Sequence, residues 1–415
     1  MTERLRVLVS AYACEPDKGS EPGVGWNWVK QIARFHDVWV MTRANNRTII
    51  GRTLAAEPIP SAHWVYLDLP RWAGFWKKGQ RGMYLYYYLW QIGAFLTGRS
   101  LFRKVGFDLT HHLTFGIDWI PSFLALLPTP FVWGPIIGAQ SANGAFRQTF
   151  PLRGRAQELI RTWVRQSSQY DPVMQWSVRR TALGVASTLE AAKHLEHLGC
   201  KKVTIHPSVG MSSHEMEVLS FVQTSAGTTT LRFLSIGRLL PSKGFHLALR
   251  AFAEVQRRFP QAEWWIIGDG PEGSRLMGLA AELGIQGKVN FWGWMPRQKV
   301  LAKLSECDVF VYPCLRGAIS MACLEAMAAG RPIICLDLGG PALQVTEGTG
   351  VKVPAISPEQ VVNDLAEAMR RLAHDQALRA RMGEAARHWV AEYFDWDRKG
   401  VWIRDIYQEV LRPCS

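Results

Sequence analysis

The chain has 415 residues, of which 48% are hydrophobic and 20% are charged. This composition excludes a chain that is disordered over most of its length, and the length predicts two to three domains. The formal net charge is +13, and residues 1–221 hold 25 basic against 15 acidic side chains. We therefore expect one face of the N-terminal half to attract anions, such as a membrane surface, a phosphorylated substrate or nucleic acid.

The cysteines argue for a reducing compartment. There are seven, an odd number, with no CxxC pair and no clustering with histidine. This favours free thiols over a disulfide framework or a structural zinc. The N-terminus, MTERLRVLVSAYACEP, lacks the order of regions of a signal peptide. The expected location is therefore the cytoplasm, and no metal site is predicted.

From the N-terminus, β-rich runs alternate with helical patterns. The first run, 5–12, leads through a glycine-bearing loop into a helix expected at 26–35. Further strands are expected at 36–43, 63–69, 107–115, 130–135, 178–188 and 201–210. The alternation of strand and helix is typical of a parallel α/β domain.

Two uncharged stretches of this half were tested as membrane spans. Residues 119–139 are long enough, but four prolines would break a helix, so we expect a helix, a turn and a buried strand. Residues 83–98 are short for a span and have basic residues on both sides. Their Tyr and Trp content suits either a helix at the membrane interface or a buried aromatic helix.

A second α/β series follows a small, polar linker at 222–230. Its strands are expected at 231–237, 262–270, 288–294, 307–313 and 331–340, with a helical tail from about 357. The predicted domains are 1–221 and 231–390, each doubly wound and Rossmann-like, with a last helical segment at 391–415 packing back on the first domain. In such folds ligands bind at the carboxyl ends of the strands.

The loop Gly237–Gly244, GRLLPSKG, combines two cations with the start of a helix. Arg238 follows a strand and Lys243 precedes the helix, so both side chains and the free amides of the first turn can bind an anion such as phosphate. The alternative is a basic loop that faces water.

Glu325 lies in a helix with no polar face, between Met321 and Ala329. A carboxylate in such surroundings is usually paired or liganded, and the hydroxyls of a ribose would serve. The alternative is a glutamate favoured near a helix start by the dipole.

Two features of the N-terminal half are weaker candidates. The loop Gly19, Ser20, Glu21, Pro22 and Gly23 permits close backbone approach to a phosphate or sugar, or is a simple turn capped by Ser20. His111 and His112 end a strand, and alternation sends them to opposite faces, so at most one can act as an acid or base in a cleft.

Taken together these segments resemble family 4 of the retaining nucleotide-sugar glycosyltransferases, which have the GT-B fold of two Rossmann-like domains facing across a cleft. In the second half the matching motifs are GRLLPSKG, WWIIGDGPEGSRL, VNFWGWMP, CDVFVYP and LEAMAAGRPIICLDLGGP. In the first half YACEPDKGSEPGVGW, HHLTFGIDWIPSF and PFVWGP are similar to a bacterial polysaccharide-type subgroup.

The resemblance implies roles for individual residues. Arg238 and Lys243, after Gly237, would hold the donor diphosphate, and Glu325 would bind the ribose. The turn from Gly268 through Gly270 and the backbone near Trp294 would lie against the nucleotide. The loop Gly19, Ser20, Glu21 and Gly23 would lie against the donor phosphate and the acceptor.

Two positions depart from the family pattern, and both remove negative charge. The first acidic residue of the family's E-x7-E motif, which contacts the donor sugar, is replaced by Gly317. Gln140 stands where the subgroup usually has a glutamate. These departures motivate an alternative, a catalytically impaired GT-B partner protein in a glycan assembly complex. The retention of Arg238, Lys243 and Glu325 argues against it.

The resemblance implies a hexosyltransferase of bacterial polysaccharide synthesis that needs no cofactor beyond its donor substrate, a nucleotide-diphosphate sugar. The acceptor would be a glycan or a lipid-linked sugar. The basic, aromatic region 69–105 predicts peripheral contact with an anionic membrane at its cytoplasmic face. No helix-turn-helix or RNA-binding module is evident, so nucleic acid is not an expected partner. The resemblance does not imply a metal, because Arg238 and Lys243 would stabilise the leaving diphosphate.

Overall fold

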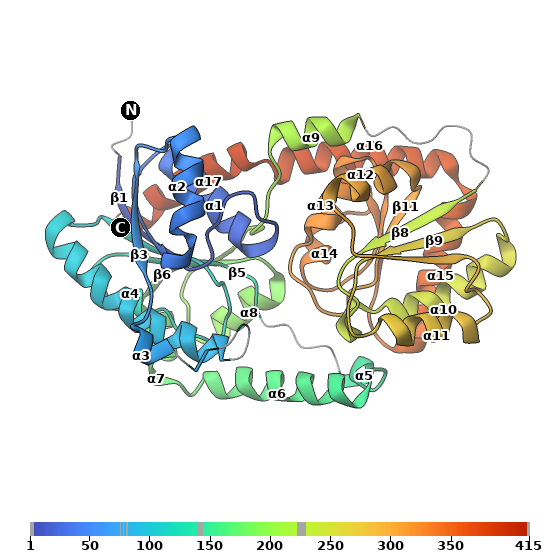
Figure 1. The fold of residues 1–415 in the computed structure, drawn as a ribbon, viewed down its shortest axis with the longest axis horizontal. Coiled ribbons are helices and arrows are strands. Elements are labelled where there is room, and N and C mark those ends of the chain that lie inside the picture. The colour runs from blue at the N-terminus through green and yellow to red at the C-terminus, as the bar shows by residue number, and fades with distance from the viewer. Residues whose placement is uncertain are drawn as a thin grey trace. The chain divides into compact units, whose positions relative to one another are not determined.

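A computed structural model describes residues 4–74, 76, 77, 79, 82–138, 144–221 and 230–412. The chain forms two compact units, each built on its own parallel sheet (Figure 1). Unit 1 comprises Met1–Ala139, Trp163–Gly210 and Trp396–Ser415, and unit 2 comprises Gln140–Thr162 and Met211–Asp395. The predicted linker at 222–230 falls outside the described residues, except for Thr230.

The sheet of unit 1 has the order β3-β2-β1-β4-β5-β6-β7, with parallel neighbours throughout. Its strands match the seven expected runs: β1 Arg6–Ala11, β2 Asp37–Arg43, β3 Ala62–Leu67, β4 Leu109–Thr114, β5 Phe131–Ile136, β6 Thr181–Ala186 and β7 Val203–Ile205. The chain order reverses between β1 and β4, which is the switch point of a doubly wound sheet.

Helices cover both faces of this sheet. They are α1 Ser20–Ala33, α2 Arg47–Ala56, α3 Arg71–Gly74, α4 Met83–Val105, α7 Pro172–Arg180, α8 Leu189–His197 and α17 Trp396–Leu411, with 3-10 turns η1 Ala44–Asn46 and η2 Phe123–Leu126. Alternation along β1 sends Val7 and Val9 into one buried cluster and Leu8 into the other. The near-continuous apolar runs in the sequence reflect this burial on both faces.

The sheet of unit 2 repeats the same winding, with the order β10-β9-β8-β11-β12-β13. Its strands are β8 Arg232–Ile236, β9 Glu263–Ile267, β10 Val289–Gly293, β11 Val309–Tyr312, β12 Ile333–Leu336 and β13 Gly350–Val353. The first five were expected. Strand β13 was not expected from the sequence. Its four residues, GVKV, are too few to show the alternation of apolar and polar side chains that identifies a strand.

The helices of unit 2 include two that lie against the sheet with strongly one-sided faces, α10 Phe245–Arg258 and α15 Pro358–His374. The others are α5 Gly144–Arg147, α9 Ser213–Ser220, α11 Gly273–Glu282, α12 Arg297–Glu306, α13 Met321–Ala328, α14 Gly339–Gln344 and α16 Gln376–Tyr393, with the 3-10 turn η3 Pro241–Lys243. Helix α6, Leu152–Ser168, begins in unit 2 and ends in unit 1.

The units are not the contiguous domains expected from the sequence. The segment around α5 comes from the first half of the chain, yet Phe146 and Phe150 are buried in the core of unit 2. As expected for the last helical segment, α17 packs on α1 of unit 1, where Trp396 contacts Trp28 edge to face. Apolar side chains that are far apart in sequence therefore decide these two assignments.

The two uncharged stretches of the first half take different forms. Residues 119–139 contain η2 and β5, as expected. Helix α4 is the buried aromatic helix on one side, where Tyr86, Tyr87 and Trp90 enter the core. On its other side Leu85 and Leu96 are exposed. Within the described part of the chain, no helix is both long and apolar enough to cross a membrane.

Candidate functional site

The loop that follows β8 opens on a pocket of about 650 Å³ in unit 2. Strand β8, which is the first strand of the switch point in this sheet, ends at Ile236. The exposed side chain of Arg238 follows two residues later. The lining residues come from the ends of β8, β9 and β10: Ile236, Gly237, Arg238, Ile267, Gly268, Asp269, Gly270, Trp294, Met295 and Val300. Five residues predicted to bind the donor therefore share one pocket.

Gly268 allows the two loops of this pocket to touch. Its φ is +134°, and a Cβ there would lie 2.1 Å from the carbonyl oxygen of Gly237. Since no side chain fits at such a distance, this position requires glycine. The amide of Leu239 in turn donates to the carbonyl of Asp269 at 2.9 Å. The GDG turn thus fixes the shape of the loop that carries Arg238.

Lys243 lies further along the same loop, at the end of η3 and two residues before α10. Its ammonium donates to the hydroxyl of Tyr312 at 2.7 Å and to the sulfur of Cys314 at 3.6 Å. Burial alone would lower the pKa of Lys243, but the contacts with Cys314 and Tyr312 outweigh it and raise the pKa. The ammonium is therefore held charged at neutral pH.

Gly317 lies in the loop after β11, the second strand of the switch point. A Cβ on Gly317 would be 3.0 Å from the sulfur of Cys314 and 3.9 Å from the hydroxyl of Tyr312. Position 317 is thus beside the groups that contact Lys243. Its neighbour Arg316 pairs with the carboxylate of Glu158 at 2.5 Å, and both side chains are largely buried.

Glu325 projects from α13, a helix capped by the hydroxyl of Ser320, which accepts from the amide of Cys323. Its side chain is 14% exposed and lies 3.1 Å from the guanidinium of Arg297. The same guanidinium is 3.0 Å from a carboxylate oxygen of Glu215 in α9. The expectation that Glu325 is paired is confirmed.

The surroundings of Glu325 act on its pKa in both directions. Burial raises the pKa of this carboxyl, Arg297 lowers it, and the nearby charge of Glu215 adds to the rise. The net result is a pKa above the ordinary value. Of these three influences, Arg297 is the one that favours the ionised form of Glu325.

Sequence reasoning missed Arg297 and Glu215, although one signal was present. Arg297 is the first residue of α12, directly after the Trp294–Met295–Pro296 segment at the pocket. A cation at a helix N-terminus opposes the helix dipole and calls for compensating acids. The pattern could have identified Arg297 but not which carboxylates compensate it.

The glycine loop of unit 1 differs from the expectation. Helix α1 begins at Ser20 and not at 26, its N-cap is Gly19, and no side chain caps it. Gly23 is inside the helix, where a Cβ would lie 1.8 Å from the carbonyl oxygen of Lys18. Its role is close packing of backbone. The alternative of a simple turn capped by Ser20 is also wrong, because Ser20 is the first residue of the helix and not its N-cap.

Glu21 is used within unit 1. Its carboxylate accepts from the amide of Gly116 at 3.0 Å, in the loop after β4. Burial raises the pKa of Glu21, and backbone hydrogen bonds from Gly116 and Phe115 oppose the rise. Gly19 and Ser20 are exposed, so they are the part of this loop that a ligand can reach.

His111 and His112 point to opposite faces of the sheet, as predicted, and both are buried. His111 is 2.5 Å from the hydroxyl of Tyr407 and 2.6 Å from the carbonyl oxygen of Gly134. His112 contacts the hydroxyls of Tyr87 at 2.9 Å and Ser122 at 2.8 Å.

Burial lowers the pKa of His111 to about 4 and that of His112 to about 3. Both rings are therefore neutral, and all four ring nitrogens are engaged inside unit 1. A catalytic role for either histidine is not supported, because neither ring presents a free nitrogen to a substrate.

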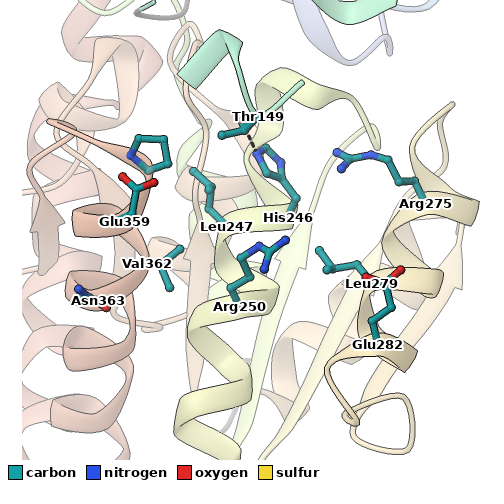
Figure 2. Close-up of a pocket in the computed structure, with 11 residues that line it drawn as sticks. Thr149, His246, Leu247, Arg250, Arg275, Leu279, Glu282, Glu359, Val362 and Asn363 are labelled. Atoms are coloured by element: carbon teal, nitrogen blue, oxygen red, sulfur yellow. Dashed lines mark hydrogen bonds between the residues drawn. The ribbon is translucent and has the colours of Figure 1, made fainter. Parts of the chain in front are cut away.

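A second pocket, of about 680 Å³, lies between α10, α11 and α15 (Figure 2). His246 contacts the hydroxyl of Thr149 at 2.8 Å, and Arg250 and Arg275 also line the pocket. Burial first, then these arginines, lower the pKa of His246 to about 3. Glu282 and Glu359 line the same pocket, so it has no marked preference for anions. None of the predicted site residues lines it.

The predicted residues thus fall into two sets. Arg238, Lys243, Gly317 and Glu325 belong to unit 2, with the pocket around Gly237, Gly268, Gly270 and Trp294. The N-terminal loop and both histidines belong to unit 1. Gln140 lies outside the described residues. Within those residues, no group of three or more His, Cys, Asp or Glu side chains is placed to hold a metal ion.

The segment of the chain that matches a known family contains the predicted residues of unit 2. Residues 220–389 match the family described as Glycosyl transferases group 1. A relative from Mycolicibacterium smegmatis, GDP-mannose-dependent alpha-(1-6)-phosphatidylinositol monomannoside mannosyltransferase, is 32% identical over 41% of this chain and 46% of its own. Lipopolysaccharide core biosynthesis glycosyltransferase LpsE of Rhizobium meliloti is 29% identical over 43% and 48%. The chain thus spans about half the length of the curated relatives it matches.

The fold is shared over nearly the whole chain. The structure of Anabaena HepE in complex with UDP and glucose has a TM-score of 0.62, with 16% identity, and covers 98% of this chain and 100% of its own. At this identity the likeness shows the fold, which is the GT-B fold of two parallel-sheet α/β domains. The pocket at the end of β8, with its glycines and Arg238, lies within the matched segment 220–389. Residues 220–389 are therefore a glycosyl transferases group 1 domain within a chain of GT-B fold.

Proposed function

We propose that this protein is a retaining glycosyltransferase that moves a sugar from a nucleotide-diphosphate sugar to a hydroxyl group of a glycan or lipid-linked acceptor. The observation that carries the proposal is the pocket at the end of β8, where Arg238, Gly268 and Trp294 line one space. The curated relatives include a GDP-mannose-dependent enzyme and a lipopolysaccharide core glycosyltransferase, which supports this class of reaction in bacterial polysaccharide synthesis.

In this proposal the residues of unit 2 divide the donor among them. The base lies against Trp294 and the backbone of Gly268 and Gly270, and Glu325 accepts hydrogen bonds from the ribose hydroxyls. Arg238 can bind the diphosphate through two N–H donors, whereas Lys243 acts as a point charge. The hydrogen bond to Tyr312 holds the Lys243 ammonium in a fixed position before the donor arrives.

The chemical step breaks the bond between the anomeric carbon and the diphosphate oxygen and forms a bond from the same carbon to the acceptor oxygen. Negative charge develops on the leaving diphosphate while the sugar gains oxocarbenium character. Arg238 and Lys243 stabilise that charge, which is electrostatic catalysis by preorganised donors. We propose that an oxygen of the departing diphosphate takes the proton of the acceptor hydroxyl, so no enzyme base is needed.

Gly317 changes the part of the site that faces the donor sugar. In place of a carboxylate, this position has no side chain, and even a Cβ there would lie 3.0 Å from the sulfur of Cys314, beside the Lys243–Tyr312 pair. A donor sugar is then positioned by hydrogen bonds from other groups, including the backbone around Gly317. The alternative of an inactive partner protein has no support from the comparisons.

We propose that the acceptor is met at an anionic membrane surface. The support is the excess of positive charge in residues 1–221 and the exposed apolar side chains Leu85 and Leu96 on α4. Lipid-linked acceptors are found at such surfaces, which attract basic segments.

The test is a turnover assay with a panel of UDP-, GDP- and ADP-sugars and lipid-linked acceptors. The variant Arg238→Ala should lose about 10²–10³ in kcat/KM, as expected for one preorganised donor to the leaving charge. The matched control is Arg257→Ala, an exposed arginine at the far end of α10, which should keep full activity. Unchanged kcat/KM in Arg238→Ala, or no turnover of any donor by the unaltered protein, would refute the proposal.

A further inference from the structure

Helix α6, the long green helix in Figure 1, presents apolar side chains to solvent. Leu152 is 81% exposed, Leu159 58%, Ile160 62% and Trp163 69%. Large apolar side chains exposed singly are normal on a protein surface, whereas a contiguous set on one helix marks a contact surface.

The spacing places these residues on one stripe. Leu152, Ala156, Leu159 and Trp163 are four, three and four residues apart, which is the repeat of a single helix face. The opposite face carries Gly154 and Glu158, both of which are buried. In an ordinary surface helix the apolar stripe faces the core. In α6 this pattern is inverted, with the polar Glu158 inward and the apolar stripe outward.

Contacts of the inner face hold α6 in this orientation. The carboxylate of Glu158 pairs with Arg316 at 2.5 Å, and both side chains are less than a fifth exposed. A Cβ on Gly154 would lie 3.2 Å from the ring of Pro241, so the backbone there is in close contact with the first residue of η3. In its last turn, Arg165 pairs with Asp118 at 2.8 Å. Rolling the helix to bury Leu159 would break these contacts.

The charge of α6 indicates what covers the stripe. The helix contains four arginines and one acidic residue, Glu158, whose carboxylate is turned inward. Arg153 and Arg155 are exposed on the two borders of the apolar stripe. An outward face with Leu, Ile and Trp at its centre and arginine at its edges suits the boundary between lipid headgroups and acyl chains, where apolar side chains insert and cations meet phosphates.

We propose that the outward face of α6 docks on an anionic lipid bilayer, with Leu159, Ile160 and Trp163 inserted and Arg153 and Arg155 on the headgroups. The helix is about 26 Å long at 1.5 Å per residue, so it would lie flat in the interface. This inference deepens the proposed encounter with a lipid-linked acceptor, because it assigns a surface to it. The geometry of α6 stands without the transferase reaction.

The experiment is sedimentation of the full chain with vesicles of phosphatidylcholine alone or mixed equally with phosphatidylglycerol. We expect binding to the mixed vesicles that weakens in high salt. Replacing Leu159, Ile160 and Trp163 together by serine should lower the partition coefficient at least about tenfold, because apolar insertion is lost. The matched control is serine at three exposed apolar positions elsewhere, Met277, Ile356 and Phe221, which should bind within about twofold of the unaltered chain.

The charges are tested separately. Arg153→Ala combined with Arg155→Ala should weaken binding to the mixed vesicles by roughly 25-fold, at about fivefold for each cation near an anionic surface. Its control is Arg257→Ala combined with Arg258→Ala, a pair of exposed arginines on α10. Circular dichroism and thermal unfolding confirm that each variant is folded, as expected for exposed positions.

Three results would overturn the inference. The first is no binding of the unaltered chain to anionic vesicles, and the second is equal loss in the α6 variants and their controls. The third is a dimer in sedimentation equilibrium that the serine variant dissociates while vesicle binding is unchanged, which would assign the stripe to a second copy. Arg238→Ala should bind vesicles normally, so failure of the transferase proposal and failure of membrane docking are distinguishable.

Discussion

Replacing Arg297 by methionine should weaken nucleotide binding mainly at low pH. At high pH the affinity should change little. In the folded protein Arg297 lies 3.1 Å from Glu325 and 3.0 Å from Glu215. It opposes the rise in the pKa of Glu325 that burial and Glu215 cause. Without Arg297 both remaining influences raise this pKa, so Glu325 is protonated at a higher pH, and its neutral carboxyl accepts hydrogen bonds from ribose more weakly than the carboxylate.

The magnitude follows from the exposure of the pair. The side chain of Arg297 is 54% exposed, so solvent screens much of its attraction, whereas Glu325 is only 14% exposed. We therefore take the upper end of the range for exposed ion pairs, about 1 kcal/mol. This corresponds to roughly fivefold in affinity under conditions where Glu325 titrates. Well above that range, both proteins should bind with affinities within about twofold of each other.

The assay is calorimetric titration with UDP, GDP and ADP between about pH 5 and about pH 8. Affinity should fall as pH falls in both proteins, and in the Arg297→Met variant the fall should begin at higher pH. Arg297→Lys keeps the charge and should restore most of the profile. Lys299→Ala removes an exposed cation from the same helix and should change nothing.

Two outcomes would refute this reasoning. Superimposable pH profiles for the unaltered protein and Arg297→Met would show that Arg297 does not control the ionisation of Glu325. A uniform loss of affinity at every pH would show that Arg297 supports the structure of the pocket and not the charge of the carboxylate.

Other changes have equally definite outcomes. Glu158→Ala removes one member of a buried ion pair and should lower the free energy of unfolding by about 3 kcal/mol in urea denaturation, whereas leucine at both Glu158 and Arg316 should recover much of the loss. Gly268→Ala should abolish detectable nucleotide binding in calorimetry, while Gly278→Ala, which meets no atom within 4 Å, should leave it intact. Burial lowers the pKa of His111 to about 4, so the stability it contributes is present above its ordinary value of 6.5 and is lost as pH falls from there towards 4. His111→Gln should flatten this part of the plot of unfolding temperature against pH, and an unchanged slope would contradict the assignment.

The strands and the loop Gly237–Gly244 could be predicted from the sequence because the patterns that identify them lie within a few consecutive residues. Apolar runs such as the one that became β8 are short, continuous and bounded by glycine, which identifies buried parallel strands. The loop with Arg238 and Lys243 was recognisable because a strand end, two cations and a helix start lie within eight residues. Strand order was then constrained by the winding rules for parallel sheets.

The partner of Glu325 could not be predicted in the same way. A helix without a polar face implied that this carboxylate is paired, and it is. The partner is Arg297, 28 residues earlier in the chain, and the guanidinium is shared with Glu215 of α9. Such a pairing depends on which helix ends meet in the folded unit, and the spacing of the residues along the chain does not predict it.

The sequence by itself determined three features. They are the two parallel α/β series, the combination of glycines and cations in the loop Gly237–Gly244, and the opposite orientation of His111 and His112. Tertiary structure alone decided that the ring nitrogens of both histidines form buried hydrogen bonds. It also decided that Phe146 belongs to the core of unit 2 and that α6 exposes its apolar stripe. The reason is physical: periodicity identifies an apolar face, but what covers that face depends on contacts between segments that are distant along the chain.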